Sequence, residues 1–343
     1  MMKIMHVGPN SIHVTGFINA LSVQAVEQSL LSDAEIKNDQ LLMAEVVHFH
    51  TFNPIIIAVN LKKVKRFLKD VQPDVLHIHQ ITRLAFWVSF VAKSLKIPIV
   101  TTAWGSDVLL MPQKNWLNRF LVTKTIQRSK IVTADAQAMI DVMKKLVNEK
   151  VVYKQMQYGI DSVPANASKE AIIYSNRLHK PLYRIDRIIE YFSEVHAQFP
   201  SFKLVIGATG DETPKLKKLV KDLKIEESVE FVGWLTNEQN REWYAKSTYY
   251  ISIPESDGTS VSLLEAISAQ CIPIVSDLPA NKEWVTDGQN GIVEKNGTNP
   301  MKVALESDFT HSLVDNAQRV NRLASRSFTI PQFYSYYEQC IAK

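Results

Sequence analysis

Strand-like and helix-like segments alternate twice along the 343 residues, and this alternation narrows the possible folds more than any other feature. After a strand-turn-helix pattern at the N-terminus, short buried-strand patterns recur at 75–79, 97–103 and 130–134. A second alternating series begins near residue 171 and continues to about residue 295. Strands and helices that alternate at this spacing are typical of parallel, doubly wound sheets. The sequence therefore predicts an α/β protein with two such domains.

The segment 161–171 separates the two series, because it contains a proline and is poor in large apolar residues. We place the first domain at 1–162 and the second at 163–327, followed by an aromatic, helix-like tail at 328–343. Two doubly wound domains around a hinge are expected to form a cleft. Ligands of such sheets bind at the carboxyl ends of the strands.

The composition favours a cytoplasmic protein. Cys271 and Cys340 both lie in apolar surroundings, which is typical of reduced thiols rather than a disulfide framework. We expect neither a signal peptide nor a membrane span, because no apolar stretch approaches the roughly 20 residues that a span requires. Residues 1–160 carry a net charge of +8 and the remainder −4. A basic first domain favours an anionic partner, although ordinary surface scatter is the alternative.

A turn at 258–260 lies between a predicted strand and a predicted helix. Backbone N–H groups at a helix N-terminus favour an anion such as phosphate, and Gly258 allows a ligand to come close. The carboxylates of Asp257 and Glu265 lie on either side of this turn. They could accept hydrogen bonds from the hydroxyl groups of a sugar and of a ribose. The structural alternative is that Asp257 caps the helix and Glu265 is a satisfied helix carboxylate.

The run 257–291 resembles the nucleotide-sugar segment of the retaining glycosyltransferases of family four, which have the GT-B fold. That family shows an acid, seven residues, a glutamate, small residues, a proline-containing strand and Asp-Gly-x-Asn-Gly. The matching residues are Asp257, Glu265, Ala266, Ala269, Pro273, Glu283, Asp287, Gly288, Asn290 and Gly291. The resemblance extends across the second domain and is weaker in the first. Asp257 stands where the family usually has Glu, so the sugar preference could differ.

The resemblance implies two Rossmann-like domains of the GT-B type, the first binding the acceptor and the second the nucleotide-sugar. It also implies that the tail at 328–343 forms a helix that packs back on the first domain. Fixed cations would hold the diphosphate, so we expect no metal ion and no cofactor. The chain also lacks the Asp-x-Asp pair of metal-dependent glycosyltransferases of the other major fold.

The family's diphosphate clamp is altered in this chain. Arg177 matches the clamp's arginine, whereas Tyr183 occupies the position of its lysine. We prefer Arg184 over Lys180 as the replacement cation. The resemblance implies that Arg177 is a bidentate phosphate ligand.

The segment TTAWGSD resembles the family's Thr-Thr-x-His-Gly-Thr-Asp, but Trp104 replaces the histidine. Trp104 could offer a flat face to a sugar or belong to the core. Asp107 becomes the acidic candidate near the acceptor, and a helix cap is its alternative role. We expect His77 and His79 to point to opposite faces of their strand, without metal-ligand company.

The family pattern completes the set of expected site residues. The expected catalytic residues are Asp107, Arg177 and Asp257. The expected donor-binding residues are Gly8, Arg184, Trp234, Gly258, Thr259, Ser260 and Glu265, and no residue is expected to bind a metal ion. Trp234 is placed beside the nucleobase by the resemblance alone.

The resemblance predicts a retaining, metal-independent transfer of a hexose-type sugar from a UDP- or GDP-sugar to a glycan acceptor, which we expect to be lipid-linked, in surface polysaccharide biosynthesis. A nucleotide-sugar epimerase of the same fold and a non-catalytic nucleotide-sugar-binding protein remain alternatives. A nucleic-acid partner is disfavoured, because no recognisable motif accompanies the cations.

Basic clusters with interleaved apolar residues predict peripheral docking on an anionic inner membrane leaflet. The basic residues are Lys62, Lys63, Lys65, Arg66, Lys144, Lys145 and Lys150, and the apolar ones Phe67, Leu68, Leu146 and Val147.

Overall fold

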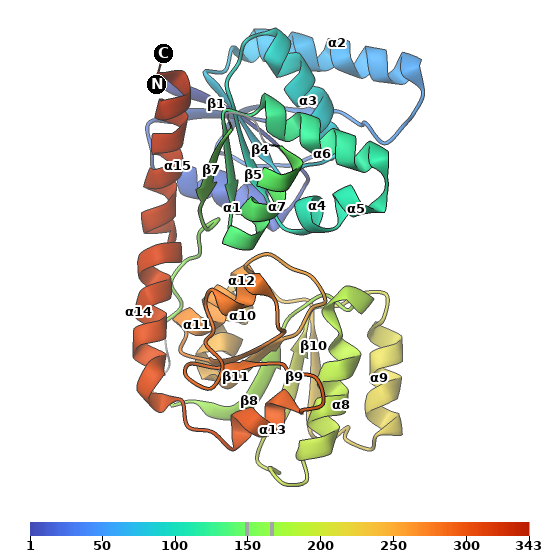
Figure 1. Ribbon diagram of the computed structural model, residues 1–343, viewed down its shortest axis with the longest axis vertical. Coiled ribbons are helices and arrows are strands. Elements are labelled where there is room, and N and C mark those ends of the chain that lie inside the picture. Colours follow the sequence, from blue (N-terminus) through green and yellow to red (C-terminus); the bar gives the residue numbers. More distant parts are fainter. Residues whose placement is uncertain (148–150, 165–167, 343) are drawn as a thin grey trace. The chain divides into compact units, whose positions relative to one another are not determined.

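The computed structural model describes residues 1–147, 151–164 and 168–342 (Figure 1). The chain forms two compact units, residues 1–159 with 326–343 and residues 160–325. Each unit contains one parallel sheet with helices on its faces. The predicted α/β class, with two doubly wound domains, is therefore confirmed.

The sheet of the first unit has seven parallel strands in the order β3-β2-β1-β4-β5-β6-β7. The strands are β1 (Met2–Gly8), β2 (Val26–Ser32), β3 (Leu41–Val46), β4 (Val75–His79), β5 (Ile99–Ala103), β6 (Ile131–Ala134) and β7 (Val152–Gln155). The helices are α1 (Ile12–Leu21), α2 (Pro54–Val71), α3 (Arg83–Ser94), α4 (Ser106–Leu109), α5 (Met111–Lys114), α6 (Trp116–Arg128), α7 (Gln137–Leu146) and α15 (Arg326–Ile341). The strand order reverses direction between β1 and β4, so the loops after these two strands border a topological switch point.

Both faces of this sheet are covered, which explains why β4 and β5 are buried along their whole length. One core combines residues of the sheet with α2 and α3, including Val64, Phe67 and Val88. The opposite core combines the sheet with α1 and α15, including Phe17 and Phe333. The predicted C-terminal helix therefore exists as α15, and its apolar side packs on the first unit (Figure 1).

Our prediction that certain apolar residues of the first unit face a lipid surface is wrong for three of them. Phe67, Leu68 and Val147 are buried, with exposed fractions of 5%, 1% and 2%. Helical periodicity turns Phe67 and Leu68 toward the sheet, since they lie on the same side of α2 as the core residues of that helix. These buried side chains cannot contact a membrane. Lys150, which belongs to the predicted basic cluster, lies outside the described residues.

The sheet of the second unit has six parallel strands in the order β10-β9-β8-β11-β12-β13. The strands are β8 (Glu170–Ser175), β9 (Lys203–Gly207), β10 (Val229–Gly233), β11 (Ser247–Ser252), β12 (Ile272–Val275) and β13 (Ile292–Val293). The helices are α8 (Ile185–Val195), α9 (Thr213–Asp222), α10 (Asn237–Lys246), α11 (Val261–Ser268), α12 (Pro279–Lys282), α13 (Pro300–Leu305) and α14 (Leu313–Ala324), with 3-10 turns η1 (Pro181–Tyr183) and η2 (Thr310–Ser312). The order reverses between β8 and β11, so segments 176–184 and 253–260 meet at the switch point of this sheet.

Candidate active site

Arg177 follows β8 at the switch point of the second sheet, and side chains from the segment after β11 surround its guanidinium. Nη2 donates to Asp257 Oδ2 at 2.6 Å, and Nη1 donates to Ser262 Oγ at 3.2 Å. Nη1 also donates to Ser260 Oγ. The ring of Tyr183 lies against the guanidinium, with its centroid 4.5 Å from Cζ. The structure thus brings together the predicted residues Arg177, Asp257 and Ser260.

The Arg177–Asp257 pair is only partly accessible, with side-chain exposures of 11% and 21%. Burial alone would lower the pKa of Arg177, but the Asp257 carboxylate raises it above its ordinary value. The guanidinium therefore stays charged. A partly desolvated cation of this kind binds an anion more strongly than a fully solvated one.

Buried and partly buried polar groups form hydrogen bonds that reach Arg177 through Ser262. The Tyr250 hydroxyl lies 2.8 Å from Ser262 Oγ and 3.1 Å from Asn176 Oδ1. Asn176 Nδ2 donates to Asn240 Oδ1 at 2.8 Å and to the Tyr244 hydroxyl at 2.7 Å. Sequence reasoning missed these positioning residues. Only the adjacency of Asn176 to Arg177 and the aromatic strand 249–250 hinted at them.

The turn 258–260 precedes α11, as predicted, and Ser260 is the N-cap residue of that helix. Within the described part of the helix, the Ser260 side chain makes no capping hydrogen bond and lies 2.6 Å from Ser262 Oγ. Asp257 Oδ1 accepts from the Gly258 N–H at 3.0 Å. The polar start of α11 therefore lies beside the Arg177 cation, a combination suited to a phosphate group.

Glu265 lies on α11, the helix that begins beside this cluster. Burial, and next the Glu265 carboxylate, raise the pKa of Tyr244 well above its ordinary value. The carboxylate also contributes to the raised pKa of Tyr174 and Tyr250. Glu265 therefore lies close to the phenols of this unit, and its contact with a ribose stays a prediction.

Arg184, which follows Tyr183 at the same switch point, forms an ion pair with Glu294. Its Nη1 and Nη2 donate to the two carboxylate oxygens of Glu294, at 2.8 and 3.0 Å. The Tyr191 hydroxyl also donates to Glu294, at 2.8 Å. Arg184 has a left-handed backbone with φ of 53°, and Lys180, the alternative cation, is exposed. The choice between these cations for the diphosphate stays a prediction.

Trp234 follows β10 and is 64% exposed. Gly233 precedes it with φ of 72°, a left-handed conformation that glycine adopts without strain. The indole is therefore available for stacking, and its place beside a nucleobase stays a prediction.

Asp107 joins two loops of the first unit. It is buried; its Oδ2 accepts from the Ile81 N–H at 2.9 Å, and its Oδ1 accepts from the N–H groups of Trp104 and Gly105 at 3.0 Å each. Burial raises the pKa of Asp107, while these backbone hydrogen bonds oppose the rise. The geometry makes Asp107 an organiser of the loops after β4 and β5, and its role near an acceptor stays a prediction.

Gly8 is the last residue of β1, and its Cα atom is closely surrounded by other residues. A Cβ atom there would lie 3.0 Å from Val14 Cγ2 and 3.1 Å from His79 Cβ. Nearby, the Trp104 ring centroid lies 5.6 Å from that of His13 and 5.8 Å from that of Tyr158. The buried Trp104 Nε1 has no hydrogen-bond partner within the described ranges.

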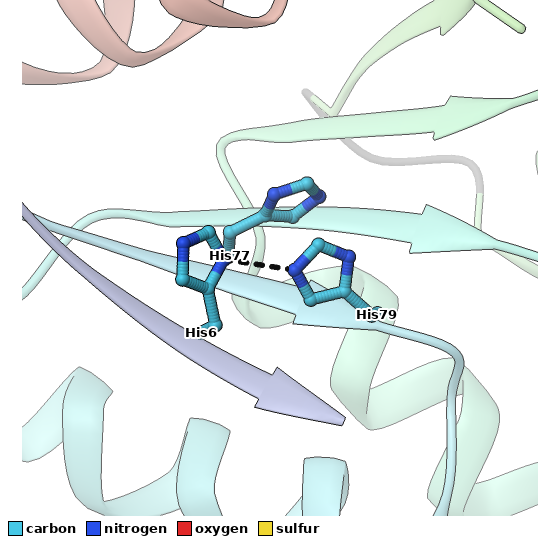
Figure 2. A group of neighbouring side chains, drawn as sticks. All are labelled: His6, His77 and His79. Atoms are coloured by element: carbon cyan, nitrogen blue, oxygen red, sulfur yellow. Dashed lines mark hydrogen bonds between the residues drawn. The ribbon is translucent and has the colours of Figure 1, made fainter. Parts of the chain in front are cut away.

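Our prediction that His77 and His79 lie on opposite faces is wrong. Residues two apart on a strand share a face, and these rings have centroids 3.9 Å apart. His6 on β1 is in register with His77 and completes a cluster (Figure 2). Nitrogen atoms of the three rings lie within 4.8 Å of one another, so the expectation that His77 and His79 lack potential metal-ligand company is also wrong.

The proton positions in this cluster follow from one amide. Gln28 Nε2 donates to the Ile18 carbonyl at 3.1 Å, so Gln28 Oε1 must accept from His6 Nε2 at 3.0 Å. Neutral His6 then accepts at Nδ1 from His79 Nε2, 2.9 Å away (Figure 2). His79 in turn accepts at Nδ1 from the Tyr158 hydroxyl at 2.7 Å.

The nitrogens of His77 also have partners. Nε2 lies 2.8 Å from Thr102 Oγ1, and Nδ1 lies 2.7 Å from the Tyr337 hydroxyl. Burial lowers the pKa of His6 to about 4 and lowers those of His77 and His79 well below the usual value. All six ring nitrogens of this neutral cluster thus have hydrogen-bond partners, and a metal ion would have to displace these hydrogen bonds.

Two families of known proteins match this chain. The family described as Glycosyl transferases group 1 matches residues 160–319, and the family described as Glycosyl transferase 4-like matches residues 3–136. The two matches fall on different units and together include most of the chain.

Among individual proteins, the N-acetyl-alpha-D-glucosaminyl L-malate synthase of Bacillus anthracis is 26% identical over 240 residues. That alignment covers 64% of this chain and 60% of the relative's own length. The alpha-monoglucosyldiacylglycerol synthase of Acholeplasma laidlawii is 22% identical over 294 residues, covering 83% of this chain and 72% of the relative.

Solved structures show the same fold. The Anabaena protein Alr3699/HepE, solved in complex with UDP, aligns with a TM-score of 0.80 at 14% identity, over 98% of this chain and all of its own. Sucrose-phosphate synthase from Thermosynechococcus elongatus aligns with a TM-score of 0.79 at 12% identity, over 99% of each chain.

Proposed function

Since the chain belongs to the group 1, GT4-like glycosyltransferases of the GT-B fold, we propose that it transfers a hexose-type sugar from a nucleoside diphosphate to a hydroxyl group with retention at the anomeric carbon. The observation that carries this proposal is the Arg177–Asp257–Ser260 cluster at the switch point of the second sheet. Its cation and helix start suit a diphosphate, and its carboxylate suits sugar hydroxyls.

The donor is a UDP- or GDP-sugar, and UDP is our first choice. The UDP complex of the Anabaena protein supports that choice, as does the UDP-N-acetylglucosamine–peptide transferase of Streptococcus pneumoniae, which is 22% identical over 160 residues. On binding, the diphosphate replaces Asp257 as the partner of Arg177. The Asp257 carboxylate is then free to accept hydrogen bonds from the sugar.

The reaction is a front-face displacement in this proposal. The bond between the anomeric carbon and the diphosphate oxygen breaks while the acceptor oxygen bonds to the same face of the carbon. The acceptor proton passes to the departing diphosphate. Arg177 and the start of α11 stabilise the negative charge that develops on the leaving group, which is usually the largest catalytic contribution.

The acceptor is a glycan, and we propose that it is lipid-linked and used in surface polysaccharide assembly on the inner face of the cytoplasmic membrane. The name of the Acholeplasma relative, alpha-monoglucosyldiacylglycerol synthase, supports a lipid acceptor. The net charge of +8 over residues 1–160 agrees with an anionic surface nearby.

A panel of nucleotide-sugars tests the donor. UDP-glucose, UDP-galactose, UDP-N-acetylglucosamine and GDP-mannose are compared for thermal stabilisation, with free UDP and AMP alongside. We expect one UDP-sugar to raise the melting temperature most, because a ligand that binds the native state stabilises it. Stabilisation by none of the nucleotides would contradict the donor site.

Product analysis tests the chemistry. The NMR coupling of the anomeric proton in the product should match that of the donor. Transfer should persist in excess EDTA, because fixed cations hold the diphosphate. Inversion would refute the retaining mechanism, and loss of activity that a divalent ion restores would refute metal independence.

A further inference from the structure

Helix α2 presents an unusual outward face. Residues 55, 59, 62, 66 and 69 follow one another at intervals of four and three, so they form one stripe along the helix. The stripe reads Ile, Val, Lys, Arg, Lys from the N-terminal end. The side toward the sheet holds the buried residues Val64, Phe67 and Leu68. The helix is therefore apolar on its inner side and again at the outer side of its first half.

The outer apolar residues are well exposed. Ile55 is 74% exposed and Val59 59%, and Ile56 beside them is 46% exposed. Phe52, just before the helix, is exposed with the Arg83 guanidinium 4.3 Å from its ring centroid. Isolated exposed apolar residues are ordinary, but a cluster of four at one helix end marks an interaction surface.

The neighbouring helices carry the same combination. Helix α3 packs between α2 and α6 on one face of the first sheet (Figure 1). Trp116 and Phe120, four residues apart on α6, are 78% and 43% exposed, and the Lys124 amino group lies 6.0 Å from the Phe120 ring centroid. Exposed apolar side chains beside basic ones are thus found on α6 as well as on α2.

The segment that contains α2, α3 and α6 has far more basic than acidic residues. Residues 54–130 contain thirteen Lys and Arg but only three Asp and Glu. One of the three, Asp107, is buried, and another, Asp70, lies 3.6 Å from Arg66. An anionic partner complements this surface.

A lipid bilayer fits these features better than a nucleic acid. Nucleic acids bind the cations through phosphates and would leave Ile55, Ile56 and Val59 in water. A membrane surface takes apolar side chains at the depth of the headgroups and places Lys and Arg beside lipid phosphates. None of the helices within residues 1–147, 151–164 and 168–342 is long and apolar enough to cross a membrane.

We infer that the outward face of α2 docks on an anionic bilayer. Ile55, Ile56 and Val59 enter the headgroup region, and Lys62, Arg66 and Lys69 contact lipid phosphates. This inference rests on the proposed function only in that a lipid-linked acceptor gives the contact a purpose.

Vesicle flotation of the full chain tests the inference. Vesicles of phosphatidylcholine alone are compared with vesicles that contain about one third phosphatidylglycerol, at low and at high salt. We expect binding to the anionic vesicles that is at least tenfold stronger than to the neutral ones and is lost at high salt. No binding to the anionic vesicles at low salt would overturn the inference.

Double variants on α2 test whether this helix provides the membrane-binding surface. Ile55→Ser with Val59→Ser, and separately Lys62→Glu with Arg66→Glu, should each reduce binding at least tenfold. The matched controls lie in the second unit, Val303→Ser with Val314→Ser and Lys218→Glu with Lys221→Glu, all at exposed positions. The controls should bind like the wild type. Equal binding by the α2 variants and the wild type would overturn the assignment to α2.

Nucleotide binding separates this inference from the proposed function. The α2 variants should keep the wild-type melting temperature and the wild-type stabilisation by the preferred nucleotide-sugar. A wild-type chain that binds nucleotide-sugar but no vesicles would overturn the membrane inference alone. A chain that binds vesicles but no nucleotide-sugar would overturn the proposed function and leave the docking surface in place.

Discussion

Arg177 is the side chain on which the proposed chemistry depends most. Because its charge is partly desolvated and held by Asp257 and Ser260, we expect Arg177→Ala to lower kcat/KM by roughly 100-fold or more, which corresponds to about 3 kcal/mol. Arg177→Lys should rescue little, since one ammonium cannot reproduce the forked contacts. Steady-state kinetics over a range of donor concentrations, from well below KM to saturation, provide the measurement. A decrease of less than threefold for Arg177→Ala would exclude Arg177 from the site.

Glu265 allows a nearly isosteric test of the donor pocket. Glu265→Gln should preserve the fold but weaken nucleotide binding about tenfold, because a hydroxyl group donates a stronger hydrogen bond to a carboxylate than to an amide. Isothermal titration calorimetry with UDP measures the change. Glu306→Gln, at an exposed position on the same unit, should leave the affinity unchanged. Equal affinities for Glu265→Gln and the wild type would count against a ribose contact.

The sequence predicted which residues lie together in the site better than it predicted which side chains form hydrogen bonds and ion pairs with one another. The motif run brought Arg177, Asp257 and Ser260 to one place, as the strand–turn–helix pattern indicated. The pairing of Arg184 with Glu294, 110 residues later in the chain, left no local pattern in the sequence. Side-chain pairing depends on tertiary geometry, which strand and helix periodicity do not encode.

At the scale of the elements, Asp107 holds the loops after β4 and β5 together. Asp107→Ala would leave the buried N–H groups of Ile81, Trp104 and Gly105 without an acceptor. We expect a loss of about 2–4 kcal/mol in the free energy of unfolding, measured by urea denaturation. Asp141→Ala, at an exposed position on α7, should change it by less than about 0.5 kcal/mol. A loss for Asp107→Ala no larger than that control would refute the organising role.

Most strands of the two sheets were predictable because they are apolar runs with a helix or turn after them. Strands β2 and β3, in which polar residues interrupt the apolar run, were not predicted. Helix α2 shows the limit of that approach. Its basic and apolar residues indicated a helix on the surface. The prediction that Phe67 and Leu68 face lipid ignored the helical period of 3.6 residues per turn, which turns both side chains toward the sheet. Ile55 and Val59, about two to four turns earlier, occupy the outer stripe. Counting positions around the helix would have separated the two sets.

At the scale of the whole first unit, the histidine cluster depends on residues from the entire chain length. Gln28 on β2 and His79 on β4 are hydrogen-bonded to His6, and Tyr337 on α15 is hydrogen-bonded to His77, whose ring lies beside that of His79. The period of a strand predicts the shared face of His77 and His79. It does not predict that His6 lies beside them, because that requires knowing that β1 pairs with β4.

This network makes stability depend on pH. Burial lowers the pKa of His6 from 6.5 to about 4, so between these values the unfolded chain binds a proton that the folded chain does not. The contribution of His6 is complete above pH 6.5 and is lost as the pH falls toward 4. At pH 5 the loss from His6 alone amounts to about 2 kcal/mol. His77 and His79, whose pKa values are also lowered, change stability in the same direction.

Urea denaturation at pH 7.5 and pH 5.0 measures this effect, and the informative quantity is the difference between the two free energies of unfolding. His6→Gln should lower stability at both pH values but reduce the difference by about 2 kcal/mol, because one buried titrating group is removed. His311→Gln, in the short turn η2, is the matched control and should leave the difference unchanged. A wild-type chain that is equally stable at pH 7.5 and pH 5.0 would show that the cluster accepts protons without cost, contrary to the neutral network that its hydrogen bonds define.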